Sequence, residues 1–400
     1  MNEFEQELVE RLAALRGQGL YRELRRINSP QLPHTDVDGK TLLNFSSNDY
    51  LGLANDPRLK EAAIRGIERY GAGSGASRLI CGSLAPHHEL EQAIAAFKGT
   101  EAALAFSSGY AAAVGTICAL LDTQDVVIID KLVHASLVDA ARLCGAELRV
   151  FAHNGLNHLA KLLRWADRRN AGLGGKRRPR TLVVTESVFS MDGDFTPLRE
   201  LVELKEKHGA WLMVDEAHAT GLYGEKRRGL AEEFGVAGRI EIQMGTLGKA
   251  LGAAGGYICG SRALIDYLVN RARSFIFSTA PVPAAAAAAT AAIHFIQSEE
   301  GQARRNQLWA RVDQVKNGLV AAAYLLPPVR SAIVPLMMGD EGRAVEAAAT
   351  LREHGVFIPA IRYPTVARGQ ARLRLTVSAA HAAADVSQLV TALSRLKRGK

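Results

Sequence analysis

The chain has 400 residues, of which 48% are hydrophobic and 22% are charged. This composition excludes an intrinsically disordered protein, and the length predicts two or three lobes rather than one typical domain. The formal net charge of +8 would suit a nucleic acid or an anionic small molecule. Because the basic residues are dispersed and no aromatic side chains alternate with them, we expect no nucleic-acid binding.

The cysteines and the apolar segments indicate the compartment. None of the four cysteines forms a CxxC pair, so we expect free thiols in a reducing cytoplasm rather than disulfides or a metal site. No apolar run has the length of a membrane span, and the N-terminus lacks the order of a signal peptide, so we expect no membrane attachment. The densest basic cluster, residues 176–180, follows three glycines and is expected to be a solvated loop.

The first part of the chain predicts a helix, a hairpin and a loop. Residues 1–27 are predicted as a helix because apolar residues recur at helical spacing, and residues 31–45 as a hairpin. Residues 71–83 carry four glycines without periodicity, which is typical of a loop that a ligand approaches closely. A strand at 102–106 then turns through Ser108-Gly109 into a helix, whose first amides and dipole suit an anion.

The middle of the chain alternates between apolar strands and amphipathic helices. This pattern predicts an α/β protein with a mostly parallel sheet covered by helices on both faces. After about residue 283 the pattern changes to a smaller α+β lobe, which the N-terminal hairpin could complete. We therefore expect an N-terminal segment at 1–56, a large α/β domain at 57–283 and a C-terminal α+β domain at 284–400. The expected central strands are 126–130, 147–151, 181–186, 211–215, 240–244 and 257–259.

Polar residues gather at the predicted carboxyl ends of these strands, where ligands of open α/β sheets bind. Besides Ser108 and Gly109, they are His134, Glu186, Ser187, Asp215, His218, Thr246 and Lys249.

Lys249 lies in a glycine-rich turn between two apparently buried strands. Enclosure would lower its pKa and make the amine able to form a Schiff base, whereas a surface turn would leave it without a role. Asp215, after four apolar residues, would pair with a cation, ligate a metal or cap a helix; His134 could be purely structural. Together these residues meet the requirements of pyridoxal 5'-phosphate, PLP.

Several motifs resemble the α-oxoamine synthase family of PLP-dependent enzymes. The resemblance implies the aspartate aminotransferase fold (fold type I), with a mostly parallel central sheet between helices and a smaller α+β C-terminal lobe. It extends over nearly the whole chain and includes NFSSNDYLGL (44–53), GSGASRLICG (73–82), FSSGY (106–110), ESVFSMDGD (186–194), DEAHATG (215–221), GTLGKALG (245–252) and FSTAPVP (277–283).

The resemblance also implies roles for individual residues. Lys249, His134, Asp215 and His218 are expected to be catalytic. Residues expected to hold the cofactor are Ser108, Gly109, Tyr110, His134, Ser187, Asp215, His218, Thr246, Lys249 and, from a neighbouring subunit of a homodimer, Ser278 and Thr279. Residues expected near the substrates are Arg22, Asn48, His134, Arg362, Thr365 and Arg374, with Arg374 as the carboxylate anchor and Arg372 at the surface.

Within the family, the motifs at 277–283 and 360–366 most resemble the branch of biotin biosynthesis. That branch implies an acyltransferase that condenses L-alanine with pimeloyl-CoA or a pimeloyl carrier protein, with loss of CO2. Residues 78–91 also resemble the branch that joins glycine to acetyl-CoA, the 2-amino-3-ketobutyrate ligase. Two further alternatives are a non-catalytic partner subunit, which the presence of Lys249 disfavours, and a dinucleotide-dependent dehydrogenase, whose GxGxxG motif is absent.

Overall fold

The computed structural model describes residues 1–172 and 178–398, so the predicted basic loop at 176–180 lies partly outside the described residues. The chain forms two compact units. The first contains Met1–Tyr50, Met191–Gly193 and Gln307–Lys400, and the second contains Leu51–Ser190 and Asp194–Asn306. Among the helices of the described residues, none combines the length and the apolarity needed to cross a membrane.

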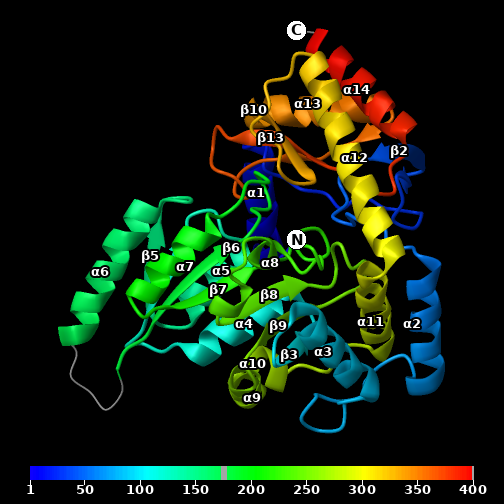
Figure 1. Cartoon of the computed structure of the whole chain (residues 1–400). Coiled ribbons are helices and arrows are strands. Elements are labelled where there is room, and N and C mark those ends of the chain that lie inside the picture. The colour runs from blue at the N-terminus through cyan, green and yellow to red at the C-terminus, as the bar shows by residue number, and fades with distance from the viewer. Residues whose placement is uncertain (173–177, 399–400) are drawn as a thin grey trace. The chain divides into compact units, whose positions relative to one another are not determined.

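The second unit is built on a seven-stranded sheet in the order β3-β9-β8-β7-β6-β4-β5 (Figure 1). All neighbours are parallel except β9, which is antiparallel to both β3 and β8. The predicted mostly parallel sheet is therefore confirmed. The strands are β3 Ala102–Phe106, β4 Val126–Asp130, β5 Glu147–Phe151, β6 Thr181–Glu186, β7 Trp211–Asp215, β8 Ile242–Thr246 and β9 Gly256–Gly260.

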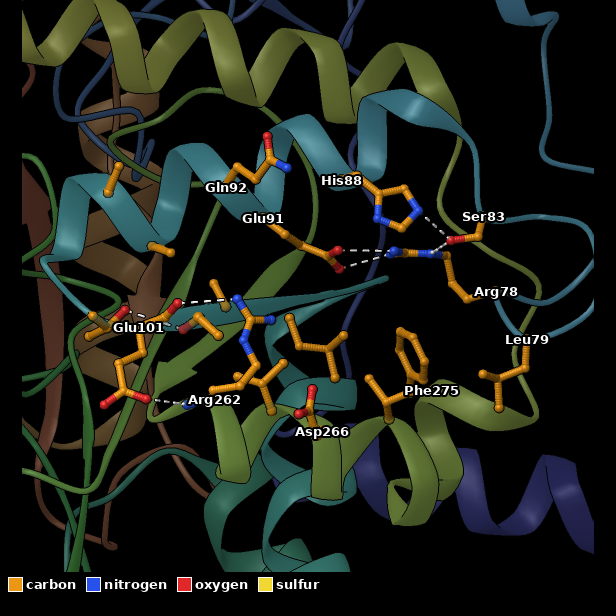
Figure 2. A pocket seen from close by; sticks show the side chains of 18 residues that line it. Arg78, Leu79, Ser83, His88, Glu91, Gln92, Glu101, Arg262, Asp266 and Phe275 are labelled. Atoms are coloured by element: carbon orange, nitrogen blue, oxygen red, sulfur yellow. Dashed lines mark hydrogen bonds and ion pairs between the residues drawn. The ribbon is translucent and has the colours of Figure 1, made fainter.

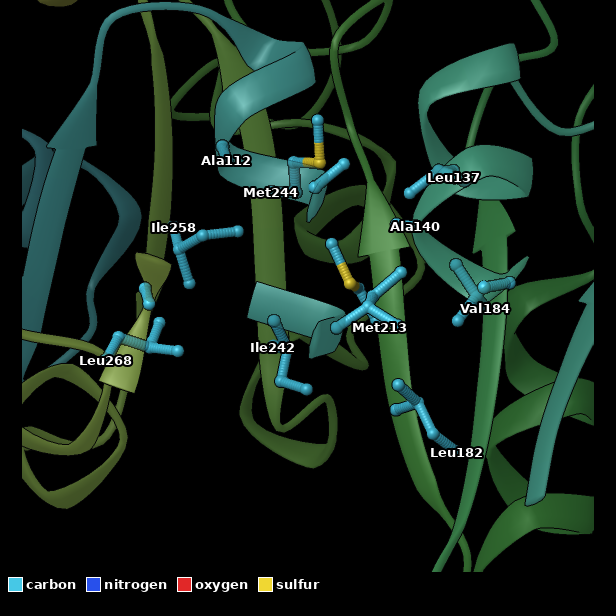
Figure 3. Close-up of a cluster of buried hydrophobic side chains, with 14 of the residues drawn as sticks. Ala112, Leu137, Ala140, Leu182, Val184, Met213, Ile242, Met244, Ile258 and Leu268 are labelled. Atoms are coloured by element: carbon cyan, nitrogen blue, oxygen red, sulfur yellow. The ribbon is translucent and has the colours of Figure 1, made fainter. Parts of the chain in front are cut away.

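Helices cover both faces of this sheet. On one face, α4 (Gly109–Leu120), α5 (Ala135–Leu143) and α9 (Arg262–Arg271) bury alternate strand residues in one apolar cluster (Figure 3). On the other face, α6 (Leu156–Gly172) and α7 (Leu198–Lys207) pack against β4, β5 and β7. Since both faces are buried, the strands have the continuous apolar character from which they were predicted.

The remaining helices of this unit explain where the predicted domain boundary fails. α11 (Pro283–Gln297), assigned from sequence to the C-terminal domain, packs against α2 (Pro57–Tyr70) and α3 (Ala85–Lys98). The helices α2 and α11 are so close that a Cβ on Gly66 would lie 3.2 Å from the Ala284 Cα. Only small residues therefore fit at this contact. The unit boundary therefore falls at 306/307, inside α12 (Glu299–Ala321), rather than at 283. Short helices are α8 Leu230–Glu233, η1 Ala237–Arg239 and α10 Arg273–Ile276.

The first unit contains two small sheets, ordered β1-β2-β11 and β10-β13-β12. The predicted hairpin at 31–45 is present as β1 and β2, and β2 pairs in parallel with β11, so the N-terminal and C-terminal parts share one unit. The strands are β1 His34–Val37, β2 Lys40–Asn44, β10 Ile333–Gly339, β11 Val356–Phe357, β12 Ala360–Ile361 and β13 Ala371–Thr376. The helices of this unit are α1 Glu3–Gly17, α13 Glu341–Glu353 and α14 Ala383–Arg398.

The predicted helix at 1–27 is too long. α1 ends at Gly17, and Gly19 adopts a φ of +66°, a left-handed conformation that glycine accepts without a steric cost and that ends a helix. The segment that follows carries Arg22, one of the predicted substrate residues, outside the helix.

Candidate active site

Lys249 lies in the connection between β8 and β9, residues 247–255. The ends of this connection are held together by hydrogen bonds from the Leu247 N–H to the Gly255 carbonyl (2.9 Å) and from the Ala253 N–H to the Leu247 carbonyl (2.8 Å). The half-buried Lys249 Nζ is 2.9 Å from Nε2 of His218. The lysine is thus a side chain on a pinned loop, directed at a residue of the β7 end, and the surface-turn alternative does not describe it.

Asp215 ends β7 and is 5% exposed, as is His218. Its Oδ1 accepts a hydrogen bond from the Ala217 N–H at 2.9 Å. Burial raises the pKa of Asp215 above its usual value, and the nearby charge of Lys249 opposes that rise. A buried carboxyl of this kind is stabilised as an anion when a cation is brought next to it.

The start of α4 forms an anion cradle beside Thr246. Ser108 caps the helix by accepting the Ala111 N–H at 3.0 Å, while the first helical amides point out of the helix. A Cβ on Gly256 would lie 2.6 Å from the Gly109 Cα, and Gly256 is the register partner of Thr246. Ser108, Gly109 and Thr246 are therefore brought together, as predicted from the strand ends.

His134 caps α5, with its ring nitrogen Nδ1 accepting the Ser136 N–H at 3.2 Å, and the residue is exposed. Although the residue as a whole is exposed, partial withdrawal of its imidazole from water lowers the pKa of His134, and the charge of Lys249 lowers it further. Ser187 is fully buried and its N–H donates to the Asp215 carbonyl at 2.9 Å. A neutral imidazole next to Lys249 and Asp215 is able to stack on an aromatic ring.

Other predicted cofactor residues are placed differently. The side chain of Tyr110 is exposed and donates its hydroxyl to Asp139 at 3.0 Å, which leaves the backbone amide as the group for an anion. Ser278 and Thr279 lie in a separate loop, where Thr279 is exposed and forms a bridge with Ser77. Their predicted role in a neighbouring subunit's site remains a prediction.

In the first unit, Arg374 is 6% exposed and its Nη1 donates to Asn48 Oδ1 (3.0 Å) and to Thr376 Oγ1 (2.9 Å). Two of the predicted substrate residues, Arg374 and Asn48, are thus in contact. Arg372 was expected at the surface, but it is 5% exposed and forms an ion pair with Asp192. The side chains of β13 do alternate between its two faces, as predicted. Both faces are buried, however, so the face that carries the arginines is not exposed to solvent.

The remaining predicted substrate residues also meet. Arg22 Nη2 approaches Thr365 Oγ1 at 3.5 Å, the outer limit of a hydrogen bond. Arg362 donates to the backbone carbonyls of Gly19 and, at 2.7 Å, Tyr21. Arg362 therefore orients the segment that carries Arg22, a positioning contact that the sequence did not indicate.

Comparisons with known proteins agree with this geometry. Residues 40–393 match the family described as aminotransferase class I and II. The chain belongs to this family. The 8-amino-7-oxononanoate synthase of Anaeromyxobacter dehalogenans is 49% identical over 96% of this chain and 93% of that protein. The enzyme of the same name from Geotalea daltonii is 46% identical over 97% of both chains.

Solved structures confirm the fold-type I expectation for this family member. A serine palmitoyltransferase variant from S. paucimobilis with a bound PLP–myriocin aldimine has a TM-score of 0.91 and 29% identity, covering 100% of this chain and 99% of that one. The 8-amino-7-oxononanoate synthase of Francisella tularensis has a TM-score of 0.73 and 27% identity, covering 90% of this chain and 98% of that one. The predicted membership of the α-oxoamine synthases, and of PLP-dependent acyltransferases, is confirmed at the level of the family.

The residues of this family member also fit PLP. The cradle at Ser108, Gly109 and Thr246 suits a phosphate, because the first N–H groups of α4 point out of the helix and Gly256 lets the backbone of β9 approach that of Gly109. Asp215 would offer a buried carboxyl to a protonated ring nitrogen, and Lys249 would offer a primary amine, which lies 2.9 Å from His218. Bound there, PLP would supply an electron sink that acidifies the Cα–H of an amino acid attached to it.

Beneath this site lies an ion pair that the sequence did not predict. Lys98, at the end of α3, donates to Glu216 at 2.5 Å and to the Arg228 carbonyl at 2.6 Å, and both charged side chains are at most 1% exposed. Burial alone would lower the pKa of Lys98, but the charge of Glu216 raises it above its usual value. Because Glu216 follows Asp215 directly, this pair fixes the backbone turn that leads to His218.

Replacing Lys98 with methionine should destabilise the protein by about 3–5 kcal/mol, because the Glu216 carboxylate would be left buried without its cation. The measurement is the free energy of unfolding of the apoprotein in urea. Lys205→Met is the matched control: Lys205 is equally buried, but its partner Glu241 is 40% exposed and stays solvated, so the loss should be about 1 kcal/mol. Equal losses of unfolding free energy in the two variants would show that the buried Lys98–Glu216 pair matters no more for stability than the Lys205–Glu241 pair.

Proposed function

We propose that the chain catalyses the decarboxylative condensation of L-alanine with the pimeloyl thioester of CoA or of a carrier protein. The products are 8-amino-7-oxononanoate, a precursor of biotin, together with the free thiol and CO2. The observation that carries the proposal is the convergence of Lys249, His218 and Asp215 beside an anion cradle, in a chain nearly half identical to relatives of that name. The relatives' names support this branch rather than the glycine and acetyl-CoA branch.

The roles of the catalytic residues follow from their contacts. Lys249 Nζ, 2.9 Å from His218, is the base that would take the proton from the amino-acid Cα. Asp215 would keep the ring nitrogen of PLP protonated, because a buried carboxylate is stabilised by a cation. Ser187 and His218 would bind the ring hydroxyl, and His134 would stack on the ring.

Charge supports the assignment of the substrate residues. The planar guanidinium of Arg374, oriented by Asn48 and Thr376, would bind the amino-acid carboxylate. Arg22, close to Thr365, would meet the far carboxylate of a pimeloyl chain, which gives a reason to prefer a dicarboxylic acyl group. Arg362 would act through the backbone at residues 19–21 rather than by contacting the substrate.

The proposal includes a homodimer that works in the cytoplasm. Apolar side chains that are exposed in the single chain support an oligomer, among them Leu79 (51%), Ile80 (78%) and Phe277 (69%). They belong to the two loops joined by the Ser77–Thr279 bridge, from which Ser278 and Thr279 would reach the phosphate of the neighbouring cofactor.

The decisive experiment is a two-by-two product assay by mass spectrometry. Alanine or glycine is supplied with pimeloyl-CoA or acetyl-CoA, and we expect 8-amino-7-oxononanoate from alanine with pimeloyl-CoA at a rate at least about tenfold above any other pair. Arg22→Ala should lower this preference by raising KM for pimeloyl-CoA more than for an acyl-CoA without a second carboxylate. Preferential formation of 2-amino-3-ketobutyrate would instead assign the glycine branch.

A further inference from the structure

Two buried carboxyl groups face each other beneath the proposed cofactor site. Glu186 ends β6 and Asp215 ends β7, and the two residues are register partners in neighbouring parallel strands. Register partners direct their side chains to the same face of a sheet. Both residues are withdrawn from water, with exposed fractions of 2% for Glu186 and 5% for Asp215. The role of Asp215 follows from the fit to PLP, but nothing in the proposed reaction uses Glu186.

Within residues 1–172 and 178–398, the Glu186 side chain has one specific contact. Its Oε1 accepts a hydrogen bond from the His134 N–H at 2.5 Å. Among the ion pairs formed by residues 1–172 and 178–398, none includes Glu186, in contrast with its neighbour Glu216, which is paired with Lys98. His134 is the residue expected to stack on the cofactor, and it is exposed at the helix start that this bond anchors.

Two adjacent buried carboxyl groups do not ionise together, because each like charge disfavours the other. Both carboxyl groups accept a backbone N–H and feel the charge of Lys249. At Asp215 that charge is the largest influence after burial, whereas at Glu186 the carboxyl of Asp215 outweighs it, so Asp215 is the member that the surroundings favour as an anion. A protonated carboxyl still has a carbonyl oxygen, so Glu186 can hold a proton and accept the His134 N–H at the same time.

We propose that Glu186 is a positioning residue of the cofactor site, which carries the shared proton of the Glu186–Asp215 pair and anchors the backbone of His134. By staying neutral, Glu186 leaves the negative charge on Asp215, where the ring nitrogen of PLP needs it. By holding the His134 N–H, it fixes the imidazole that stacks on the ring. The inference rests on PLP as the cofactor and is independent of which amino acid and thioester react.

The groups that face Glu186 agree with this assignment. Burial and then the charge of Asp215 raise the pKa of Glu186 to about 8; Asp130 at the end of β4 adds to the rise, and Lys249 and the His134 N–H oppose it. In the unfolded chain the carboxyl has its ordinary pKa of 4.5. The folded protein therefore holds one more proton than the unfolded chain between these values, and the stability present below pH 4.5 is lost as the pH rises to about 8.

The proton is tested by infrared difference spectroscopy of the PLP-loaded protein at pH 7, wild type minus Glu186→Gln. We expect the carbonyl stretch of a protonated carboxylic acid, sensitive to deuterium exchange, in this difference. Glu91→Gln is the matched control, because the Glu91 side chain is only 12% exposed but accepts two hydrogen bonds from Arg78 (Figure 2). A difference spectrum without the acid band overturns the proton assignment, as does the same band in the Glu91 difference.

Positioning is tested by the affinity of the apoprotein for PLP. Glu186→Gln keeps an acceptor for the His134 N–H, so its dissociation constant for PLP should stay within about threefold of wild type. Glu186→Leu leaves that N–H without a partner and should bind PLP about tenfold or more weakly. If the glutamine variant loses as much affinity as the leucine variant, Glu186 acts as an anion and the proposal is wrong.

A third measurement needs neither the cofactor nor the leucine variant. Between pH 5 and pH 8, the free energy of unfolding of the wild-type apoprotein should fall more steeply with pH than that of Glu186→Gln. The difference between the two slopes should correspond to one bound proton. Equal slopes would overturn the proton assignment. These tests remain informative if the substrates are not alanine and pimeloyl-CoA, since that outcome is read from the product assay alone.

Discussion

Lys249→Ala should lower turnover by at least about 10³-fold, because the variant lacks both the amine proposed to bind the cofactor and the proposed base beside His218. The protein should still bind PLP through the cradle at the start of α4, so it should remain coloured when loaded. The colour should, however, no longer be fixed to the chain by borohydride. The measurements are product formation by mass spectrometry and the absorbance that remains on the protein after reduction and denaturation.

Lys131→Ala provides the control for this experiment. Lys131 is exposed directly after β4, so it lies on the same edge of the sheet without taking part in the cofactor contacts described above. Its replacement should change neither turnover nor the reducible chromophore. Retained turnover in Lys249→Ala would exclude the proposed reaction, and a reducible chromophore in that variant would assign the cofactor to another lysine.

Asp215→Asn should lower turnover by about 10²–10³-fold while the protein remains folded. The asparagine oxygen can still accept the Ala217 N–H, so the turn after β7 keeps its hydrogen bond. What disappears is the negative charge that would keep the ring nitrogen of PLP protonated. The measurements are kcat and the absorbance spectrum of the bound cofactor as a function of pH, in which the ring-dependent bands should move.

Asp139→Asn is the matched control for the loss of a carboxylate. Asp139 accepts the Tyr110 hydroxyl at the start of α4, and the proposed reaction gives it no role at the ring nitrogen. We expect its kcat to remain within about threefold of wild type. A comparable loss in both variants would mean that turnover responds to net charge in general rather than to Asp215.

The sheet and the residues at its edge could be predicted because their signals are local. The strands β4, β6, β7 and β8 are apolar runs that end in a polar residue, and the end of a parallel strand is also the ligand-binding edge of the sheet. Asp215, His218 and Lys249 were therefore placed together from sequence, and the contact of Lys249 with His218 agrees with that prediction.

Pairings between distant segments could not be predicted in the same way. Lys98 and Glu216 are 118 positions apart, and neither residue has a local pattern that names its partner. The same holds for Arg372, whose burial depends on Asp192 rather than on the alternation of its own strand. Glu186 was recognised as a polar strand end, but its importance depends on register with Asp215, which requires the order of the strands.

The predicted end of the first helix and the predicted domain boundary were wrong for a different reason. The apolar spacing that predicts α1 continues past the point where the helix stops, and only Gly17 and Gly19 mark its end. The domain boundary near residue 283 failed because a change in composition is not a change in packing, as the contact of α11 with α2 and α3 shows.

The antiparallel pairing of β8 with β9 sets a limit on how this region can be redesigned. Thr246 and Gly256 are fixed opposite each other, so the connection that carries Lys249 has a set length between two anchored ends. An inserted or deleted residue at 247–255 would rotate the lysine away from His218 even if every side chain were kept. Variant libraries should therefore change residue identity in this connection while holding its length constant.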